Sequence, residues 1–235
     1  YVWQDSIEPN TPDALFPNNW ISFHKPKTIV TYPMYAVNRQ MEVSKAPIEF
    51  LESKGYLFSN QIDFTYFISS NLFLEGTGSM VLDRVNQIAY CARSDRTNPI
   101  LIDKFCQKMG YRAVVFSSFQ SVKRKRQLIY HTNVMMSIGL DFAMVCLDSI
   151  DETKERNALI HSLETTGKTI IELTEKQIHR YAGNVLELQS NNGDRLLAMS
   201  TSAFDALTDP QKAAFSSKLT MVHSPLTTIE RLGGG

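Results

Sequence analysis

Four polar residues recur at nearly even spacing along the chain and could together carry acid–base chemistry. They are Asn19, Glu75, His131 and Asn184, separated by 56, 56 and 53 residues, and each leads into an apolar, strand-like segment. A glutamate and a histidine can move protons at neutral pH because imidazole titrates there. If the segments are repeats packed around one axis, these side chains meet at that axis. A simpler interpretation stays open, in which strands begin with polar residues because turns precede them.

The segments repeat one order of elements. Two strand-like stretches joined by a turn come first, followed by a helix and then by a third, β-branched strand. The clearest helix runs from Pro99 to Met109, because proline begins it and Gly110 ends it. The repeats cover about 13–67, 72–118, 129–174 and 182–223. A single ββαβ unit cannot cover both faces of its sheet, so the units must pack together in an α/β fold.

Local patterns also predict individual elements. Strands are expected over 74–83 and 133–139, and a helix over 151–166 that Gly167 ends. The Asn-Asn-Gly-Asp stretch at 191–194 is typical of a hairpin turn. The basic run at 123–126 has little positive charge around it, so a solvated loop is favoured over a phosphate site.

The composition excludes several classes of protein. Lys plus Arg and Asp plus Glu both number 24, so the net charge is zero and no nucleic-acid or membrane partner is indicated. No apolar run reaches the roughly 18 residues of a membrane-spanning helix, and no signal peptide is visible. Cys91, Cys106 and Cys146 lie in apolar surroundings without paired spacing, which favours buried thiols in a reducing, cytoplasmic compartment. No zinc motif occurs.

Particular segments resemble a known superfamily. TPDALFPNNW, FLEGTGS, SDRTNP, IYHTNV, AGNVLE and PLTTIERLGGG are similar to those of the pentein, or guanidine-modifying, enzymes. This superfamily includes arginine deiminases, dimethylarginine dimethylaminohydrolases and amidinotransferases, and the chain looks closest to its citrulline hydrolase (citrulline ureidase) branch. The resemblance implies a five-bladed, pseudo-symmetric α/β propeller of ββαβ units. Residues 1–235 would then be a single catalytic domain whose first and last parts are incomplete.

The resemblance also implies a cysteine nucleophile after the glycine run. The repeat period places the opening residue of a fifth unit at about 237–240, and the family's cysteine would fall at about residue 239. We therefore expect the nucleophile just after Gly235, outside this chain.

Site residues follow from the same motifs. His131 matches the family's catalytic histidine, and Glu75 matches a glutamate that supports this histidine and touches the substrate's nitrogen end. Asp13 matches an aspartate that holds the α-amino group. Arg39 and Arg96 match arginines that bind the α-carboxylate, for which a guanidinium fork is well suited. A surface salt bridge remains the alternative for each arginine.

Two positions depart from the relatives that act on a guanidinium cation. Asn19 and Asn133 stand where such enzymes carry aspartate. A buried cation needs carboxylate partners, whereas an amide can also donate to a neutral ureido oxygen. This pattern favours citrulline as the substrate.

The expected reaction converts L-citrulline to ornithine, ammonia and carbon dioxide through a cysteine thioester, with no metal or organic cofactor. An arginine or methylarginine deiminase, or an amidinotransferase, is the first alternative. A non-catalytic pentein-fold binding protein is an alternative of another class. The expected partner is a small molecule, and the sequence is compatible with a homo-oligomer without indicating one.

Overall fold

The computed structural model describes residues 2–4, 8–215 and 217–233. In that part of the chain, four sheets have three strands each and a fifth has two. In every three-stranded sheet the first two strands in sequence are antiparallel neighbours, and the third lies parallel to the second. This is the strand order expected of ββαβ units.

The strands fall into four groups in chain order. The first sheet has β1 (Ile21–His24), β2 (Thr28–Thr31) and β3 (Asn60–Asp63), and the second has β4 (Met80–Asp83), β5 (Ile88–Ala92) and β6 (Arg112–Phe116). The third has β9 (Met136–Ile138), β10 (Phe142–Val145) and β11 (Thr169–Glu172), and the fourth has β12 (Leu186–Gln189), β13 (Arg195–Ser200) and β14 (Thr220–Ser224).

Helices connect the second strand of each sheet to the third. They are α2 (Ala46–Ser53), α4 (Pro99–Met109), α5 (Thr153–Thr165), and the pair α7 (Thr201–Ala206) and α8 (Asp209–Ala213). Local signals fix their ends. The Asn98 side chain accepts from the Ile100 amide at the start of α4, and Gly110 ends that helix at φ +72°. Helix α8 begins with a reciprocal capping box between Thr208 and Gln211.

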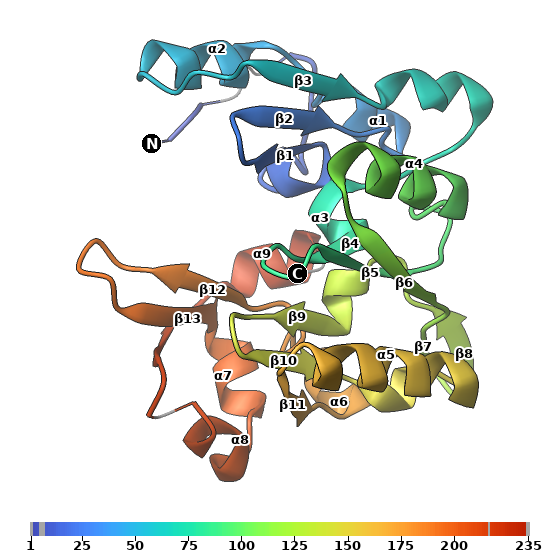
Figure 1. Ribbon diagram of the computed structural model, residues 1–235, viewed down its shortest axis with the longest axis vertical. Helices are drawn as coiled ribbons and strands as arrows, with labels where there is room; N and C mark the ends of the chain where they lie inside the picture. Colours follow the sequence, from blue (N-terminus) through green and yellow to red (C-terminus); the bar gives the residue numbers. More distant parts are fainter. Residues whose placement is uncertain (1, 5–7, 216, 234–235) are drawn as a thin grey trace.

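The remaining α-helices have four residues each, except the last, which has seven, and several 3-10 turns accompany them. They are α1 (Val37–Gln40), α3 (Gly76–Ser79), α6 (Glu175–Ile178) and α9 (Thr227–Gly233), with the 3-10 turns η1 (Pro17–Asn19), η2 (Thr65–Ser70), η3 (Thr132–Val134) and η4 (Leu147–Ser149). Figure 1 shows α9 near the middle of the view with sheets on several sides of it, and α2, α5 and α8 toward the outside.

Apolar side chains join neighbouring units into a continuous interior. One cluster runs from Val81 to Leu219 and includes residues of the last three sheets. A second cluster joins the first two sheets through Tyr32, Phe64 and Phe105. Both of these clusters cross a boundary between units, so neighbouring units share a core.

The predicted strands at 74–83 and 133–139 begin later than the sequence suggests. Helix α3 occupies Gly76–Ser79 and turn η3 occupies Thr132–Val134, so β4 begins at Met80 and β9 at Met136. The cause is a hydrogen bond that interrupts the extended backbone: the Ser79 amide donates to the Glu75 carbonyl, and the Met135 amide donates to the Thr132 carbonyl. These turns lie where the candidate site residues are.

The basic run at 123–126 is exposed to solvent, as predicted, and it is also ordered. It forms the turn between β7 (Phe119–Val122) and β8 (Lys125–Leu128), with Lys123 and Arg124 at positive φ. Arg126 is ion-paired with Asp151 and Glu175. Because Asp151 and Glu175 are distant in sequence from Arg126, a local pattern could not predict these ion pairs.

The described units do not make a closed ring of five. The structure has the α/β fold with ββαβ units, and within the described residues it has four such sheets and a two-stranded hairpin.

Candidate active site

The start of each first strand is held by a short turn. Asn19 ends η1, Glu75 immediately precedes α3, and His131 immediately precedes η3. Helix α3 packs against both η1 and η3. Thr132 ties two of these starts together, since its hydroxyl donates to the Ser79 carbonyl at 2.6 Å and accepts from the Ala92 amide at 2.7 Å. Asn19, Glu75 and His131 therefore lie close together, as the repeat predicts.

His131 and Glu75 form a buried pair. The His131 Nε2 lies 2.6 Å from Glu75 Oε2, and the two residues are 5 % and 0 % exposed. The other carboxylate oxygen accepts from the Tyr35 amide at 2.9 Å, and Arg96 Nη1 lies 3.3 Å from Oε2. Glu75 is thus satisfied on both oxygens, as a buried carboxylate must be.

Burial and charge set the protonation of this pair. Burial raises the pKa of Glu75, but His131 and Arg96 outweigh it, so the pKa is lowered and the carboxylate is ionised. Burial lowers the pKa of His131 below its ordinary value of 6.5, against the opposing effect of Glu75. An ionised carboxylate only accepts hydrogen bonds, so Nε2 carries the proton and Nδ1 is left as the acceptor. The pair can therefore take up and return one proton.

Gly78 allows the close approach of Asn19 and His131. A β-carbon at this position would lie 2.8 Å from Asn19 Oδ1 and 2.9 Å from His131 Nδ1. Both distances are too short for real contacts, so a side chain here would displace the site residues. The neighbouring Gly76 has φ +44°, and a β-carbon there would lie 2.3 Å from the Asn18 carbonyl oxygen.

Arg96 presents a positive charge beside this pair. Its guanidinium carbon lies 5.1 Å from the centre of the Tyr130 ring and 6.0 Å from that of Tyr35. Its side chain is 29 % exposed, whereas Glu75 beneath it is fully covered. Aromatic neighbours hold the guanidinium plane while leaving part of it open to a ligand.

Arg39 has a partner that sequence reasoning did not name. Its Nε and Nη2 each donate to one oxygen of Glu42 at 2.9 Å, and its side chain is 6 % exposed. Its Nη2 also lies 3.2 Å from the carbonyl oxygens of Asp13 and Phe16. Arg39 therefore holds the loop before β1, and two of its nitrogens are occupied by protein groups.

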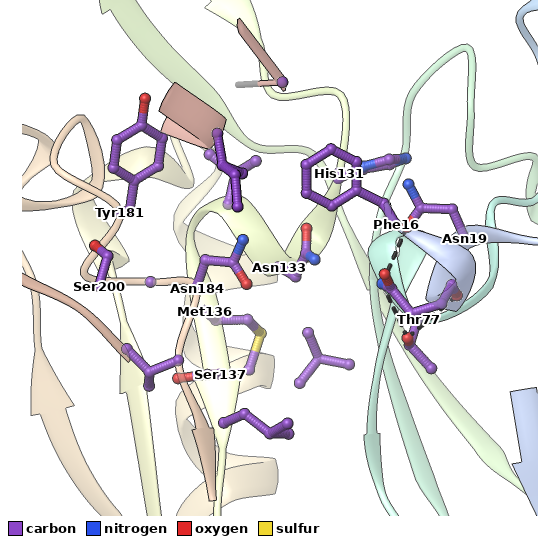
Figure 2. Close-up of a pocket in the computed structure, with 18 of the residues that line it drawn as sticks. Phe16, Asn19, Thr77, His131, Asn133, Met136, Ser137, Tyr181, Asn184 and Ser200 are labelled. Atoms are coloured by element: carbon purple, nitrogen blue, oxygen red, sulfur yellow. Dashed lines mark hydrogen bonds between the residues drawn. The ribbon is translucent and has the colours of Figure 1, made fainter. Parts of the chain in front are cut away.

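A cavity of about 930 Å³ lies beside these residues. Elements of several units line it, from the loop before β1 to α9. Its polar lining includes Asp13, Asn18, Asn19, Arg39, Thr77, Arg96, His131, Asn133, Asn184 and Glu230. In the view of Figure 2, Asn133 lies between Asn184 and His131, with Asn19 beyond the histidine. The Glu75 carboxylate is not part of the lining and lies behind His131, to which it is hydrogen-bonded.

The structure thus brings together every site residue that the sequence predicts, with Glu75 behind the others. It also adds residues that had no assigned role. Tyr181 donates from its hydroxyl to the Glu230 carbonyl at 2.8 Å, and Ser202 donates to the Glu230 carboxylate at 2.8 Å. Glu230 lies in the TIERLGGG segment, whose motif assigned no role to this residue. Tyr181 and Ser202 carry no local signal of this contact.

The three cysteines are buried free thiols, as expected. Burial raises the pKa of each, that of Cys106 to about 11, so these thiols stay protonated. Among the described residues that line the cavity there is no cysteine. Gly233 ends α9 against the Phe16 ring, and Gly234 and Gly235 of the glycine run lie outside the described residues.

Two negative findings complete the geometry. Within the described ranges, no three His, Cys, Asp or Glu side chains come together as a set of metal ligands. None of the helices in those ranges is both long and apolar enough to pass through a membrane.

Comparison with known proteins identifies the family. The model of the eukaryotic N,N-dimethylarginine dimethylhydrolase family matches residues 1–235. The chain belongs to this family. Dimethylarginine dimethylhydrolases are pentein enzymes that modify guanidino groups, so the superfamily expected from the motifs is confirmed, although the citrulline branch within it is not. A comparison with curated protein sequences finds no match.

Solved structures share the family's fold at low identity. ArgZ, an arginine dihydrolase of the ornithine–ammonia cycle in cyanobacteria, matches in its apo form with a TM-score of 0.69 and 13 % identity over 96 % of this chain and 32 % of its own. Unliganded AgrE matches with a TM-score of 0.69 and 17 % identity over 95 % of this chain and 29 % of its own.

A dimethylarginine dimethylaminohydrolase adduct with 4-chloro-2-hydroxymethylpyridine matches with a TM-score of 0.58 and 14 % identity over 96 % of this chain and 76 % of its own. The present chain therefore spans most of the length of that dimethylarginine dimethylaminohydrolase. It spans only about a third of the ArgZ and AgrE chains.

Proposed function

We propose that the full-length protein is a hydrolase that cleaves a C–N bond at the guanidino or ureido carbon of an amino acid, through a covalent intermediate on a cysteine sulfur. The buried His131–Glu75 pair, 2.6 Å apart beside a polar cavity of about 930 Å³, carries this proposal. Such a pair can move one proton in each direction, which two-step hydrolysis requires.

Each step has a place for its proton. The cysteine thiol first transfers its proton to His131, which leaves a thiolate and a protonated imidazole. The thiolate attacks the central carbon, the S–C bond forms, and the C–N bond breaks as His131 donates this proton to the departing nitrogen. A water molecule then gives a proton back to His131 and attacks the same carbon, and the S–C bond breaks to restore the thiolate. Glu75 stabilises the imidazolium that is present before the first step and is formed again in the second.

We place the nucleophile after Gly235. Helix α9 ends at Gly233 beside Phe16 in the cavity lining, so the chain is directed to the site at that point. The three described cysteines are buried elsewhere. By the same reasoning, residues 1–235 form most of a single pentein domain, and a fifth unit completes a five-bladed propeller.

An arginine-type substrate is the first candidate. The family is named for dimethylarginine hydrolysis, and the similar structures include an arginine dihydrolase bound to its substrate and AgrE complexes with L-arginine or with ornithine and NAD+. We propose that Arg96 binds the α-carboxylate and Asp13 the α-amino group, because both line the cavity. Arg39 then acts indirectly, by holding the Asp13 loop.

Citrulline is the second candidate, because three amides line the cavity. Asn19, Asn133 and Asn184 offer donors that suit a neutral ureido oxygen and the oxyanion that forms on it. A guanidinium cation lacks an acceptor and would leave these donors unpaired. Glu75 does not offset this, because both of its oxygens already accept from protein donors and it does not line the cavity.

The test is incubation of the full-length protein with L-arginine and, separately, with L-citrulline, followed by mass spectrometry of the amino-acid products. Conversion of arginine to citrulline or ornithine supports the first candidate, and conversion of citrulline alone to ornithine supports the second. Loss of turnover in His131→Asn, with Glu164→Gln on the exposed face of α5 as the control, ties either reaction to this site. Binding of both compounds without turnover of either would instead indicate a binding protein.

A further inference from the structure

The orientation of the Asn19 side chain is determined by a chain of three hydrogen bonds. Thr77 Oγ1 donates to the Asn18 carbonyl oxygen at 3.3 Å. The Asn18 side-chain nitrogen lies 3.3 Å from the same Thr77 oxygen and 3.0 Å from Asn19 Oδ1. Figure 2 draws the two amide hydrogen bonds as dashed lines between Thr77 and Asn19.

One set of donors accounts for all three hydrogen bonds, whereas turning over the Asn18 and Asn19 amides would lose the bond from Thr77 to the Asn18 carbonyl. A hydroxyl has one proton, and that of Thr77 is used on the Asn18 carbonyl. The Thr77 oxygen can then only accept from the Asn18 side chain, so the nearer end of that amide must be its NH2 group. The same NH2 group donates to Asn19, so the Asn19 atom that faces it must be the oxygen.

The Asn19 NH2 group is therefore turned the other way. In Figure 2 it lies on the side of the residue that faces His131 in this view, away from Thr77. Asn19 is 6 % exposed and lines the cavity. Within the described residues this NH2 group makes no hydrogen bond, and its nitrogen is accessible rather than enclosed, since Asn19 lines the cavity. A donor that is open to the cavity favours a ligand that supplies an acceptor.

We propose that Thr77 and Asn18 are positioning residues that hold Asn19 as a hydrogen-bond donor and so bias the site toward a neutral ureido group over a guanidinium. This proposal rests on the second candidate of the proposed function, citrulline, and it deepens that candidate by assigning the selectivity to a Thr77–Asn18 relay outside the reacting groups. A ureido oxygen accepts from the Asn19 NH2 group, whereas the nitrogens of a guanidinium are all donors. If the relay were absent, Asn19 could turn its oxygen to the cavity and the bias would fall.

The test compares Thr77→Val with Thr77→Ser in the full-length protein. Valine keeps the size and β-branching of threonine but removes the hydroxyl, and serine keeps the hydroxyl. Binding of L-citrulline and L-arginine is measured by calorimetry, and turnover of both is measured by product formation. We expect Thr77→Val to lower the citrulline-to-arginine preference about tenfold, which is about 1.4 kcal/mol, and Thr77→Ser to keep it within about twofold. Thermal unfolding checks that both variants are folded.

The outcomes separate this proposal from the proposed function. Turnover with an unchanged preference in Thr77→Val overturns the positioning role and leaves the hydrolase intact. A binding preference for citrulline that Thr77→Val removes, without turnover in the parent protein, supports the positioning role and overturns the hydrolase. A parent protein that prefers arginine, or binds neither compound, overturns the positioning role as stated.

Discussion

Replacing Glu75 with glutamine tests the coupling between the carboxylate and His131 with little change of shape. Three donors face the two oxygens of Glu75: His131 Nε2 at 2.6 Å, the Tyr35 amide at 2.9 Å and Arg96 Nη1 at 3.3 Å. A glutamine has one oxygen and one NH2 group, so at least one of these donors is left facing another donor. An unsatisfied buried donor costs about 1–3 kcal/mol, and we expect Glu75→Gln to be destabilised by that amount.

The larger effect is on the proton affinity of His131. Loss of an opposite charge within hydrogen-bond distance moves a pKa by about 1–3 units, or about 1.4–4 kcal/mol. Glu75 opposes the lowering of the His131 pKa by burial, so without it the pKa of His131 falls further. The step that needs a protonated imidazole then slows, and we expect kcat of the full-length protein to fall about 10²–10⁴-fold.

The shift is measurable without substrate. In protein with labelled histidine, the His131 ring resonances are followed against pH in the parent, in Glu75→Gln and in the control Glu164→Gln. Burial and Arg84 lower the pKa of His24 to about 4, so its signal must be assigned separately. A His131 midpoint in Glu75→Gln that stays equal to the parent's, or moves up, refutes the coupling. If the limb of the pH–rate profile that reports His131 does not move to lower pH in Glu75→Gln, the role of this coupling in catalysis is refuted.

Three further predictions follow from the packing and the ion pairs. Gly78→Ala places a β-carbon 2.9 Å from His131 Nδ1, so we expect loss of activity with about 1–3 kcal/mol of destabilisation in urea unfolding; an active variant would show that the site can relax. Lys168→Met leaves the buried Asp83 carboxylate without its cation at 3.1 Å, which should lower the free energy of unfolding by about 3–5 kcal/mol, and a loss below 1 kcal/mol would contradict this. Two cationic partners lower the pKa of Asp141 to about 2, so its stabilisation is present above its unfolded pKa of about 3.9 and lost as the pH falls toward 2. The stability difference between parent and Asp141→Asn should therefore shrink from pH 5 to pH 2, and a constant difference would contradict the assignment.

Local signals were sufficient for most of the units. The proline and glycine that bound α4 and the Asn-Gly turn between β12 and β13 act within a few residues, so their elements could be predicted. The even spacing of Asn19, Glu75 and His131 was informative because each unit repeats the same turn before its first strand.

The contacts within the site could not be predicted in this way. The hydrogen bonds of Glu75 join it to Tyr35, Arg96 and His131, which are 40, 21 and 56 residues away. Arg39 was matched to an arginine that binds a ligand carboxylate, with a surface salt bridge as the alternative; in the structure it pairs with Glu42, three residues on, and the pair is buried. Propensity and spacing carry no information about which of two carboxylates an arginine meets.

The Arg39–Glu42 pair also bears on the end of the described chain. Arg39 holds the Phe16 carbonyl, and a β-carbon on Gly233 would lie 2.8 Å from the Phe16 ring. Helix α9 is held at its other side by the Tyr181 hydroxyl on the Glu230 carbonyl. The first and last described units are thus joined across the cavity through Phe16 and α9. If the nucleophile follows α9, as proposed, these same contacts would position it, and the buried Arg39 would contribute to the site through the Phe16 carbonyl.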